Sequence, residues 1–385
     1  MTDKDFKTQL KILDCDRSRL RIGGVACIFY VAFLLIFCAL FFVFPDKSFS
    51  ENENRMLSNA SSISASTVLD GTFPEKIRAV ISDQFPFRNA FVGIESYLSL
   101  AFTGNANGVN LNKSASLSKE VTLRAESLEM LEASINAIKS LESTFCSQYK
   151  IKSSFAIVPL PCRAYQNRQS ECDIGFRTLE KELDSNGMLS FAKQAQSYDG
   201  IFYKTDHHLN ADGTYLLYLF VCDQLGVEPM TDFTKVCVSE SFYGTTWSQS
   251  GLWATPPDKI YKLSYEEENT YTVSGDVTGE SLYFPEKLET KDKYAYFLGG
   301  NYGYIEINSV SDIERPRLLI IKDSYANALI PLLARHFDLT VIDPRYYSGG
   351  VRQIASECDS CLFLFGTSSL ISDIGLAALS FDSEN

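Results

Sequence analysis

Two short polar stretches hold the residues of this chain that are best suited to chemistry. The segment Thr205–His208 reads Thr-Asp-His-His and contains two of the three histidines in 385 residues. The segment Lys322–Ser324 reads Lys-Asp-Ser and follows directly on the apolar run Leu318–Ile321. A helical pattern begins just after it, so Ser324 is predicted to lie where a buried strand turns into a helix. Functional groups gather at such strand ends in α/β proteins.

A serine at a strand end needs an imidazole to take its proton and a carboxylate to orient that imidazole. His336 is predicted at the far end of the helix that follows Ser324, roughly 18 Å away at 1.5 Å per residue, so it is a poor candidate for the base. The base must therefore come from the Asp-His-His cluster. Asp206 and His208 are two positions apart and share one face of an extended chain. We predict Ser324 as nucleophile, His208 as base and Asp206 as the orienting acid.

Other interpretations of the same residues remain open. Asp323 or Ser324 could simply cap the following helix, since both residue types are favoured there. Asp206, His207 and His208 are also a possible metal-ligand set, although a catalytic metal needs about three protein ligands and a second shell around them. We favour serine chemistry, which requires neither a metal nor another cofactor.

Acyl transfer also needs hydrogen-bond donors for the negatively charged oxygen that develops on the acyl carbon. The Ser324 amide is one candidate. Gly300 and Asn301 follow a strand-like pattern and offer flexible backbone and a side-chain amide, although a plain β-turn explains them equally well. His207 and Arg345 complete the set of candidates for oxyanion or substrate binding, and His207 is expected to point away from Asp206.

The N-terminal region predicts a membrane anchor. Residues 24–44 carry no charge and are about as long as the ~20 residues that cross a bilayer. Basic residues concentrate in residues 1–23, which we expect to stay in the cytoplasm and leave the rest of the chain outside. A cleaved signal peptide fits less well, because its apolar core would be shorter and small residues would mark the cut. The formal net charge of -13 argues against a nucleic-acid surface.

The remaining sequence predicts a polar linker at 45–70 and a globular region at 71–385. Buried strands are predicted at 153–159, 318–321, 339–343 and 361–365, and helices at 118–149, 176–195, 326–336 and near 349–357. A further helix should begin after Asn210, which can cap it. This alternation predicts an α/β fold with a parallel, doubly wound sheet. Residues 230–311 are expected to form a β-rich insertion, with strand-like stretches at 294–298 and 304–307.

The cysteines raise the question of disulfide bonds. Cys162 and Cys172 lie close together in a loop-like stretch and are the best candidates for a pair. Cys358 and Cys361 form a single CxxC without a second pair at zinc-ribbon spacing. For these two we favour a buried structural role over metal or redox chemistry.

Several motifs together resemble the DHHW family. They are TDHHLNADGTYLLY, IIKDSYANALIPLLARHFDLTVIDPRYY, ENRML, DQFPFRNAF and FLGGNYGYIEI, and they extend from about Glu53 to near residue 370. DHHW proteins are membrane-anchored relatives of the alginate O-acetylation proteins, within the SGNH/GDSL hydrolase-like group. The resemblance implies a three-layer α/β/α fold and a Ser-His-Asp site made of Ser324, His208 and Asp206. Leu209 replaces the family's tryptophan after the second histidine, so one aromatic wall of the site is expected to be missing.

The function implied by this resemblance is that of a membrane-anchored, extracytoplasmic serine O-acyltransferase or esterase. It would add or remove acetyl groups on a cell-envelope or secreted polysaccharide. A multi-span membrane acyltransferase would be the partner that supplies acyl groups, because the chain has no multi-span carrier of its own. The alternative is a catalytically inactive glycan-binding or assembly protein of the same fold.

Overall fold

The structure is a computed structural model that describes residues 24–112, 115–164, 173–195, 197–198, 200–266, 269–311 and 314–380. The chain divides into two compact units, one up to Glu95 and one from Ser96 onward. The division falls inside helix α4 (Arg88–Thr103). The two units are described separately below.

The first unit contains an apolar helix followed by short elements. The helix Gly24–Val43 has 20 residues, and its length and composition suit a membrane span or a signal sequence. The stretch expected to be a linker instead carries a hairpin of β1 (Phe49–Ser50) and β2 (Arg55–Met56), followed by α2 (Ala65–Leu69). Helix α3 (Phe73–Asp83) comes next and leads into α4.

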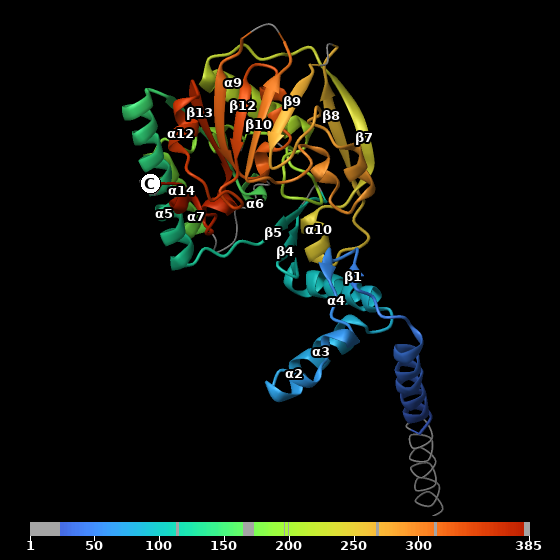
Figure 1. Ribbon diagram of the computed structural model, residues 1–385. Helices are drawn as coiled ribbons and strands as arrows, with labels where there is room; N and C mark the ends of the chain where they lie inside the picture. Colours follow the sequence, from blue (N-terminus) through green and yellow to red (C-terminus); the bar gives the residue numbers. More distant parts are fainter. Residues whose placement is uncertain are drawn as a thin grey trace, which may run out of the picture. The chain divides into compact units, whose positions relative to one another are not determined.

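The second unit is built on a six-stranded sheet (Figure 1). In spatial order its strands are β6 (Lys152–Val158), β13 (Ser360–Gly366), β11 (Arg317–Lys322), β12 (Asp338–Ile342), β10 (Tyr304–Ser309) and β9 (Tyr271–Gly275). The first four are parallel, as the strand–helix alternation predicted. The last two pair antiparallel. The fold is therefore mixed α/β with a mostly parallel sheet.

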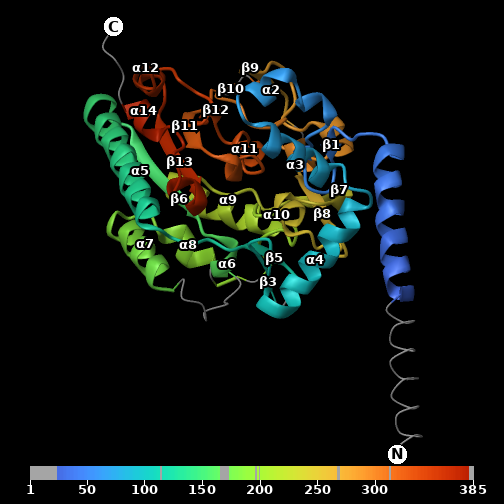
Figure 2. The same ribbon diagram turned by 90° about the horizontal axis from the view of Figure 1, so that it is seen from below.

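The parallel strands are buried on both faces, which explains why they read as nearly continuous apolar runs. In β11, Leu318 and Ile320 join one core, and Leu319 and Ile321 join the other. One core is covered by α9 (Ala211–Leu225) and α11 (Ile330–Leu333). The other is covered by α5 (Ala125–Thr144), α7 (Asp173–Ser185), α12 (Arg352–Ser356) and α14 (Leu376–Ser380), and α8 (Ser190–Ala195) contributes to both. In Figure 2, α5 and α14 lie together along the side of the sheet opposite α9.

The expected β-rich insertion at 230–311 is not confirmed as a separate body. Its strands β9 and β10 extend the central sheet. Strands β7 (Thr234–Phe242) and β8 (Asp258–Ser264) form a hairpin that encloses α10 (Thr245–Ser250). A separate small sheet is formed by three strands that precede the central sheet in sequence: β3 (Asn105–Ala106), β4 (Val109–Leu111) and β5 (Leu117–Lys119). The remaining short helices are α6 (Pro161–Ala164) and α13 (Thr367–Leu370).

Two predicted elements differ from the structure near the site. The helix expected at 326–336 becomes a 3₁₀ turn, η5 (Ser324–Ala326), and the short α11. Pro331 lies in the first turn of α11, because a proline cannot donate the backbone hydrogen bond that a helix interior needs. The strand expected at 294–298 is instead a 3₁₀ helix, η4 (Lys293–Tyr296).

The cysteine predictions meet the structure only in part. Cys172 lies outside the described residues, so the expected Cys162–Cys172 pair is not described. Cys358 and Cys361 are both buried thiols, as a structural role requires. Burial raises the pKa of Cys358 to about 11 and also raises that of Cys361. Both therefore stay protonated and unreactive near neutral pH.

Candidate active site

The Asp-His-His segment lies in a loop that is tied at both ends. An isolated bridge pairs Phe202 with Leu209, and the Tyr203 N–H donates to the His208 carbonyl at 3.1 Å. Residues 204–208 are bends, whereas the sequence analysis placed Asp206 and His208 on one face of an extended chain. Asn210 then caps α9, because its side-chain oxygen accepts from the N–H groups of Asp212 and Gly213. That cap was predicted.

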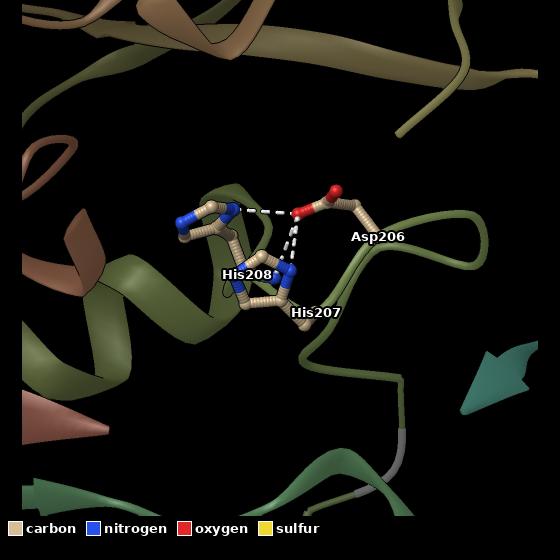
Figure 3. A group of neighbouring side chains, drawn as sticks. All are labelled: Asp206, His207 and His208. Carbon is tan, nitrogen blue, oxygen red and sulfur yellow. Dashed lines mark hydrogen bonds and ion pairs between the residues drawn. The ribbon is translucent and has the colours of Figure 1, made fainter. Parts of the chain in front are cut away.

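Asp206 holds His208 through a turn and not through an extended strand. Its Oδ1 accepts from the His208 backbone N–H at 3.0 Å and lies 2.5 Å from His208 Nδ1. Ring nitrogens of both histidines face this carboxylate (Figure 3). Burial alone would raise the pKa of the Asp206 carboxyl, but the two imidazoles and the hydrogen bonds from His208 outweigh it and lower the pKa. Asp206 is therefore a buried carboxylate anion near neutral pH.

Helix α10 supports the same carboxylate from the other side. Asp206 Oδ2 accepts from the Thr245 N–H at 2.7 Å and from the Thr245 hydroxyl at 3.0 Å. Gly244 lies against Asp206 so closely that an added Cβ would be 2.2 Å from the Asp206 Cβ. The position before Thr245 therefore accepts no side chain without moving Asp206.

Asp323 performs the capping role that the sequence left open between Asp323 and Ser324. Its Oδ1 accepts from the Tyr325 N–H at 2.9 Å, and its Oδ2 accepts from Gly366 and Ser369. Ser324 is thus released from capping. Its Oγ lies 2.8 Å from His208 Nε2, although the two residues are 116 positions apart.

An aromatic ring packs flat against the imidazole of His208. The ring of Tyr294 stacks on it with centroids 3.9 Å apart and an interplanar angle of 14°. Leu209, which replaces the family's tryptophan, is buried in the core instead. An aromatic ring therefore lies beside His208 in this chain, and it comes from the 3₁₀ helix η4.

With this geometry in place, the chain can be compared with known proteins. Residues 188–342 match the DHHW protein family model. The stretch contains the predicted nucleophile, base and acid, and it confirms the DHHW resemblance. No curated protein matches the chain.

Two solved structures show the same fold, and a third is more distant. A DHHW family protein from Eubacterium siraeum is 18% identical, covers 71% of this chain and 95% of its own, and gives a TM-score of 0.58. Bacillus cereus PatB1, in a structure with a sulfonyl adduct, is 21% identical. It covers 69% of this chain and 97% of its own, and it gives a TM-score of 0.56. The O-acetyltransferase domain of Pseudomonas putida AlgJ is more distant, at 15% identity, 72% and 96% coverage and a TM-score of 0.42.

The first histidine of the Asp-His-His segment does not point away from Asp206 as expected. His207 Nδ1 lies 3.4 Å from Asp206 Oδ1 and 3.1 Å from Thr245 Oγ1. The centroids of the His207 and His208 rings are 4.0 Å apart. Burial and the neighbouring His208 lower the pKa of His207 to about 3, against the attraction of Asp206. His207 is therefore neutral near pH 7 and can serve as a hydrogen-bonding wall of the site.

Two positions before Ser324 the chain carries a buried cation. Lys322 is 1% exposed, and its Nζ donates to Asn327 Oδ1 at 2.8 Å and lies 3.3 Å from Asp343 Oδ2. Arg345 donates to both oxygens of Asp343, at 2.8 and 2.6 Å. Burial lowers the pKa of Lys322, and the negative charge of Asp343 partly offsets this. Arg345, predicted to bind substrate, is thus half-buried and held by Asp343.

The same network reaches the predicted oxyanion residues. Asn327 Nδ2 donates to the Gly300 carbonyl at 3.2 Å and to Asn301 Oδ1 at 3.1 Å. Asn327 lies three positions after Ser324, so it ties the Gly300–Asn301 loop to the turn that carries the nucleophile. With its oxygen engaged, Asn301 keeps its side-chain N–H groups for another acceptor.

The Asp-His-His cluster also satisfies the spacing of a metal site. Ligand atoms of Asp206, His207 and His208 all lie within 4.8 Å of one another. However, His208 Nδ1 is engaged with Asp206 and its Nε2 with Ser324. A metal ion bound by His208 would have to replace one of these two contacts.

Three contributors to the site escaped the sequence analysis. Thr245 and Tyr294 come from short helices inside the region read as β-rich, where periodicity gave no signal. Asn327 stands in the quoted motif but was read only as part of a helix. A search for a second polar group three residues after Ser324 would have found it, because a tight turn brings such residues onto one side.

Proposed function

We propose that this protein is a membrane-anchored, extracytoplasmic serine O-acyltransferase or esterase of the SGNH type. The observation that carries the proposal is the continuous chain from Ser324 Oγ to His208 Nε2 at 2.8 Å and from His208 Nδ1 to Asp206 Oδ1 at 2.5 Å. Such a chain is the arrangement that activates a serine. A buried carboxylate with a lowered pKa supports it, since Asp206 stays ionised while His208 accepts a proton.

The reaction follows from these contacts. Ser324 Oγ attacks the acyl carbonyl carbon while its proton moves to His208 Nε2. The resulting imidazolium is stabilised by the Asp206 anion and then gives its proton to the leaving oxygen, which departs and leaves an acyl-serine. A sugar hydroxyl or water next attacks the acyl carbon, His208 takes the attacker's proton, and Ser324 Oγ is released with that proton. Transfer and hydrolysis differ only in this attacker.

The developing oxyanion needs donors in a fixed position. We assign this role to Asn301 and the backbone beside Gly300, because Asn327 ties that loop to the Ser324 turn. His207 is assigned to the substrate side of the site, since it is neutral and its side chain is 29% exposed. Arg345 keeps a partly exposed guanidinium beside this network and is assigned to polar groups of the substrate.

The substrate class rests on the DHHW resemblance. We propose acetyl groups on a cell-envelope or secreted polysaccharide, with a multi-span membrane acyltransferase supplying the acyl group. The basic residues before the helix Gly24–Val43 support an anchor that leaves the second unit outside the membrane.

The decisive experiment uses the full chain purified in detergent. Hydrolysis of p-nitrophenyl acetate is measured for the parent, for Ser324→Ala and for Ser197→Ala, which changes an exposed serine elsewhere in the chain. We expect Ser324→Ala to lose nearly all activity and Ser197→Ala to keep it. A sulfonyl fluoride should label the peptide that contains Ser324, as read by mass spectrometry. Transfer is then tested with acetylated donor and an oligosaccharide acceptor.

The alternatives give different results in the same assay. An inactive glycan-binding protein would show equal background rates for parent and Ser324→Ala, together with no sulfonyl label. A metal mechanism would leave activity in Ser324→Ala and remove it with a chelator. Either outcome would reject the serine mechanism.

A further inference from the structure

The motifs ENRML and DQFPFRNAF play no part in the catalytic geometry, yet the first unit brings them together. Asp83 accepts from the Arg55 guanidinium at 2.5 and 3.1 Å and from the Ser58 N–H at 2.9 Å. Arg88 pairs with Glu53. Gln84 donates to the carbonyls of Lys47 and Ser58. These contacts fix the turn between α3 and α4 against the β1–β2 hairpin.

The turn held in this way presents a group of phenylalanines. Phe85, Phe87 and Phe91, here called the turn aromatic cluster, are 38%, 59% and 42% exposed. Ile81 on α3 and Ile94 on α4 extend the apolar surface and are 50% and 58% exposed. A cluster of large exposed apolar side chains calls for a partner or a membrane.

Contacts between the cluster and the N-terminal helix favour a membrane over a protein partner. Phe37 lies 5.5 Å from Phe85, 6.4 Å from Phe87 and 5.9 Å from Phe91, measured between ring centroids. Phe44, just after the helix, lies 5.8 Å from Phe87. The cluster thus packs along the last two turns of the apolar helix and against the residue that follows it.

The position of Phe37 along the helix sets the depth of the turn aromatic cluster in the bilayer. It lies six residues before the helix end at Val43, which is roughly 9 Å along the axis at 1.5 Å per residue. A helix of 20 residues is about as long as the hydrocarbon core is thick, ~30 Å. If this helix spans the bilayer, the side chains that touch Phe37 must lie below the level at which the helix emerges.

We propose that the turn aromatic cluster is a membrane-docking surface that inserts into the lipid leaflet from which the N-terminal helix emerges. The inference rests on the anchoring part of the proposed function and not on its chemistry. Aromatic rings favour the membrane interface, where their apolar area leaves water. The ion pairs behind the cluster fit this placement, because charges brought close to lipid without partners are costly. Hydrogen bonding and attraction from Arg55 lower the pKa of Asp83, so that pair stays ionised.

The test uses the full chain reconstituted into vesicles of phosphatidylcholine and phosphatidylglycerol, some carrying bromine on their acyl chains. Phe87→Trp and, separately, Phe91→Trp place a fluorophore in the cluster. Leu69→Trp on α2, at a residue 88% exposed in the same unit, is the matched control. The emission of the parent, which has two tryptophans, is subtracted. We expect the added emission in the cluster variants to be blue-shifted and mostly quenched by brominated lipid, and that of the control to be quenched little.

Two further readouts separate the premises. Resistance to alkaline carbonate extraction reports whether the N-terminal helix is inserted, and p-nitrophenyl acetate hydrolysis reports whether the catalytic proposal holds. An inserted protein whose cluster variants emit as in water overturns the docking surface alone. Extraction by carbonate overturns the anchor and the docking surface together. A third outcome is that the emission of the cluster variants is blue-shifted in native membranes but is not quenched by bromine in pure lipid vesicles. It would assign the surface to a protein partner and overturn the lipid proposal.

Discussion

Thr245 holds the side of the Asp206 carboxylate that faces away from His208. Its N–H and its hydroxyl both donate to Oδ2, at 2.7 and 3.0 Å, while Oδ1 faces the imidazole. The carboxylate can therefore rotate neither toward solvent nor away from His208 without losing two hydrogen bonds. Orientation of the acid in this protein depends on a residue 39 positions away on another element.

Replacing the Thr245 hydroxyl should weaken catalysis without removing any catalytic group. Thr245→Val keeps the shape and the backbone hydrogen bond but loses the hydroxyl contact, which is worth about 1.5–3 kcal/mol when the acceptor is charged. We expect kcat/KM for p-nitrophenyl acetate to fall about tenfold or more. Thr245→Ser keeps a hydroxyl and should stay near the parent value. Equal rates for Thr245→Val and the parent would remove Thr245 from the site.

The proposed triad should behave as one unit. Ser324→Ala and His208→Ala are each expected to lower kcat/KM by roughly 10³-fold or more, and the double variant should be little worse than either. Asp206→Asn should be milder, because it disturbs the tautomer but leaves the base in place. His207→Ala should cost less than His208→Ala. Multiplicative losses in the double variant would mean that Ser324 and His208 act independently.

Gly244 should tolerate no side chain. An alanine Cβ there would lie 2.2 Å from Asp206 Cβ and 2.3 Å from its Oδ2, so Gly244→Ala must displace the carboxylate. The backbone itself has φ of -81° and would accept alanine, so the effect is purely steric. We expect an activity loss of tenfold or more, roughly the effect of a carboxylate moved by about 1 Å. Gly279→Ala, where an added Cβ meets nothing within 4 Å, is the control and should retain activity.

Acid should destabilise the protein, and His207 should account for part of the effect. Its pKa of about 3 in the fold lies below the ordinary 6.5, so between these values the unfolded chain binds more protons. Stability therefore falls as pH drops through this window, by at most about 1.4 kcal/mol per pH unit for one proton. The lowered pKa of Asp206 adds a further loss below its ordinary value of 3.8.

Urea unfolding at several pH values measures this dependence. His207→Gln should flatten the fall between pH 6.5 and pH 4.5, because a glutamine does not titrate. Some slope should remain, since burial also lowers the pKa of His336. An unchanged slope in His207→Gln would show that His207 is protonated equally in both states.

The buried Lys322 should be important for stability and for the position of the loop at Asn301. Lys322→Met removes a cation from Asp343 and a donor from Asn327. We expect the free energy of unfolding to fall by about 3 kcal/mol, at the lower end of the range for a broken buried ion pair. The lower end applies because Arg345 still binds Asp343. Asn327→Leu should lower the free energy of unfolding less in the Lys322→Met variant than in the parent, because the two residues are in contact. Urea unfolding of the single and double variants measures the coupling. Simple additivity would contradict the network.

The parts of the site that sequence could predict are those with local signals. The apolar run into Ser324 marked the end of β11, and Asn210 marked the start of α9, because both depend on neighbours in sequence. Pairing Ser324 with His208 followed from chemistry, since few other groups could serve as the base.

The remainder depends on packing between distant segments. Tyr294 reaches His208 from a 3₁₀ helix, and Asp258 holds the loop before Asp206 by accepting from the N–H groups of Lys204 and Thr205. Neither segment has a periodicity that reports its position. The antiparallel placement of β9 and β10 was missed for the same reason, because strand direction is set by the route of the chain and not by residue pattern.

The strand order has a consequence for the newly made chain. Strand β6 lies at the edge of the sheet, and its neighbour there is β13, which is the last strand of the sheet to be synthesised. At 5–20 residues per second, β6 waits about 10–40 s for that partner. Its apolar residues Ala156, Ile157 and Val158 remain without the partner strand throughout, which exposes an aggregation-prone edge to other nascent chains. Production of this protein should therefore depend on a chaperone that holds the region before β13 while the ribosome completes it.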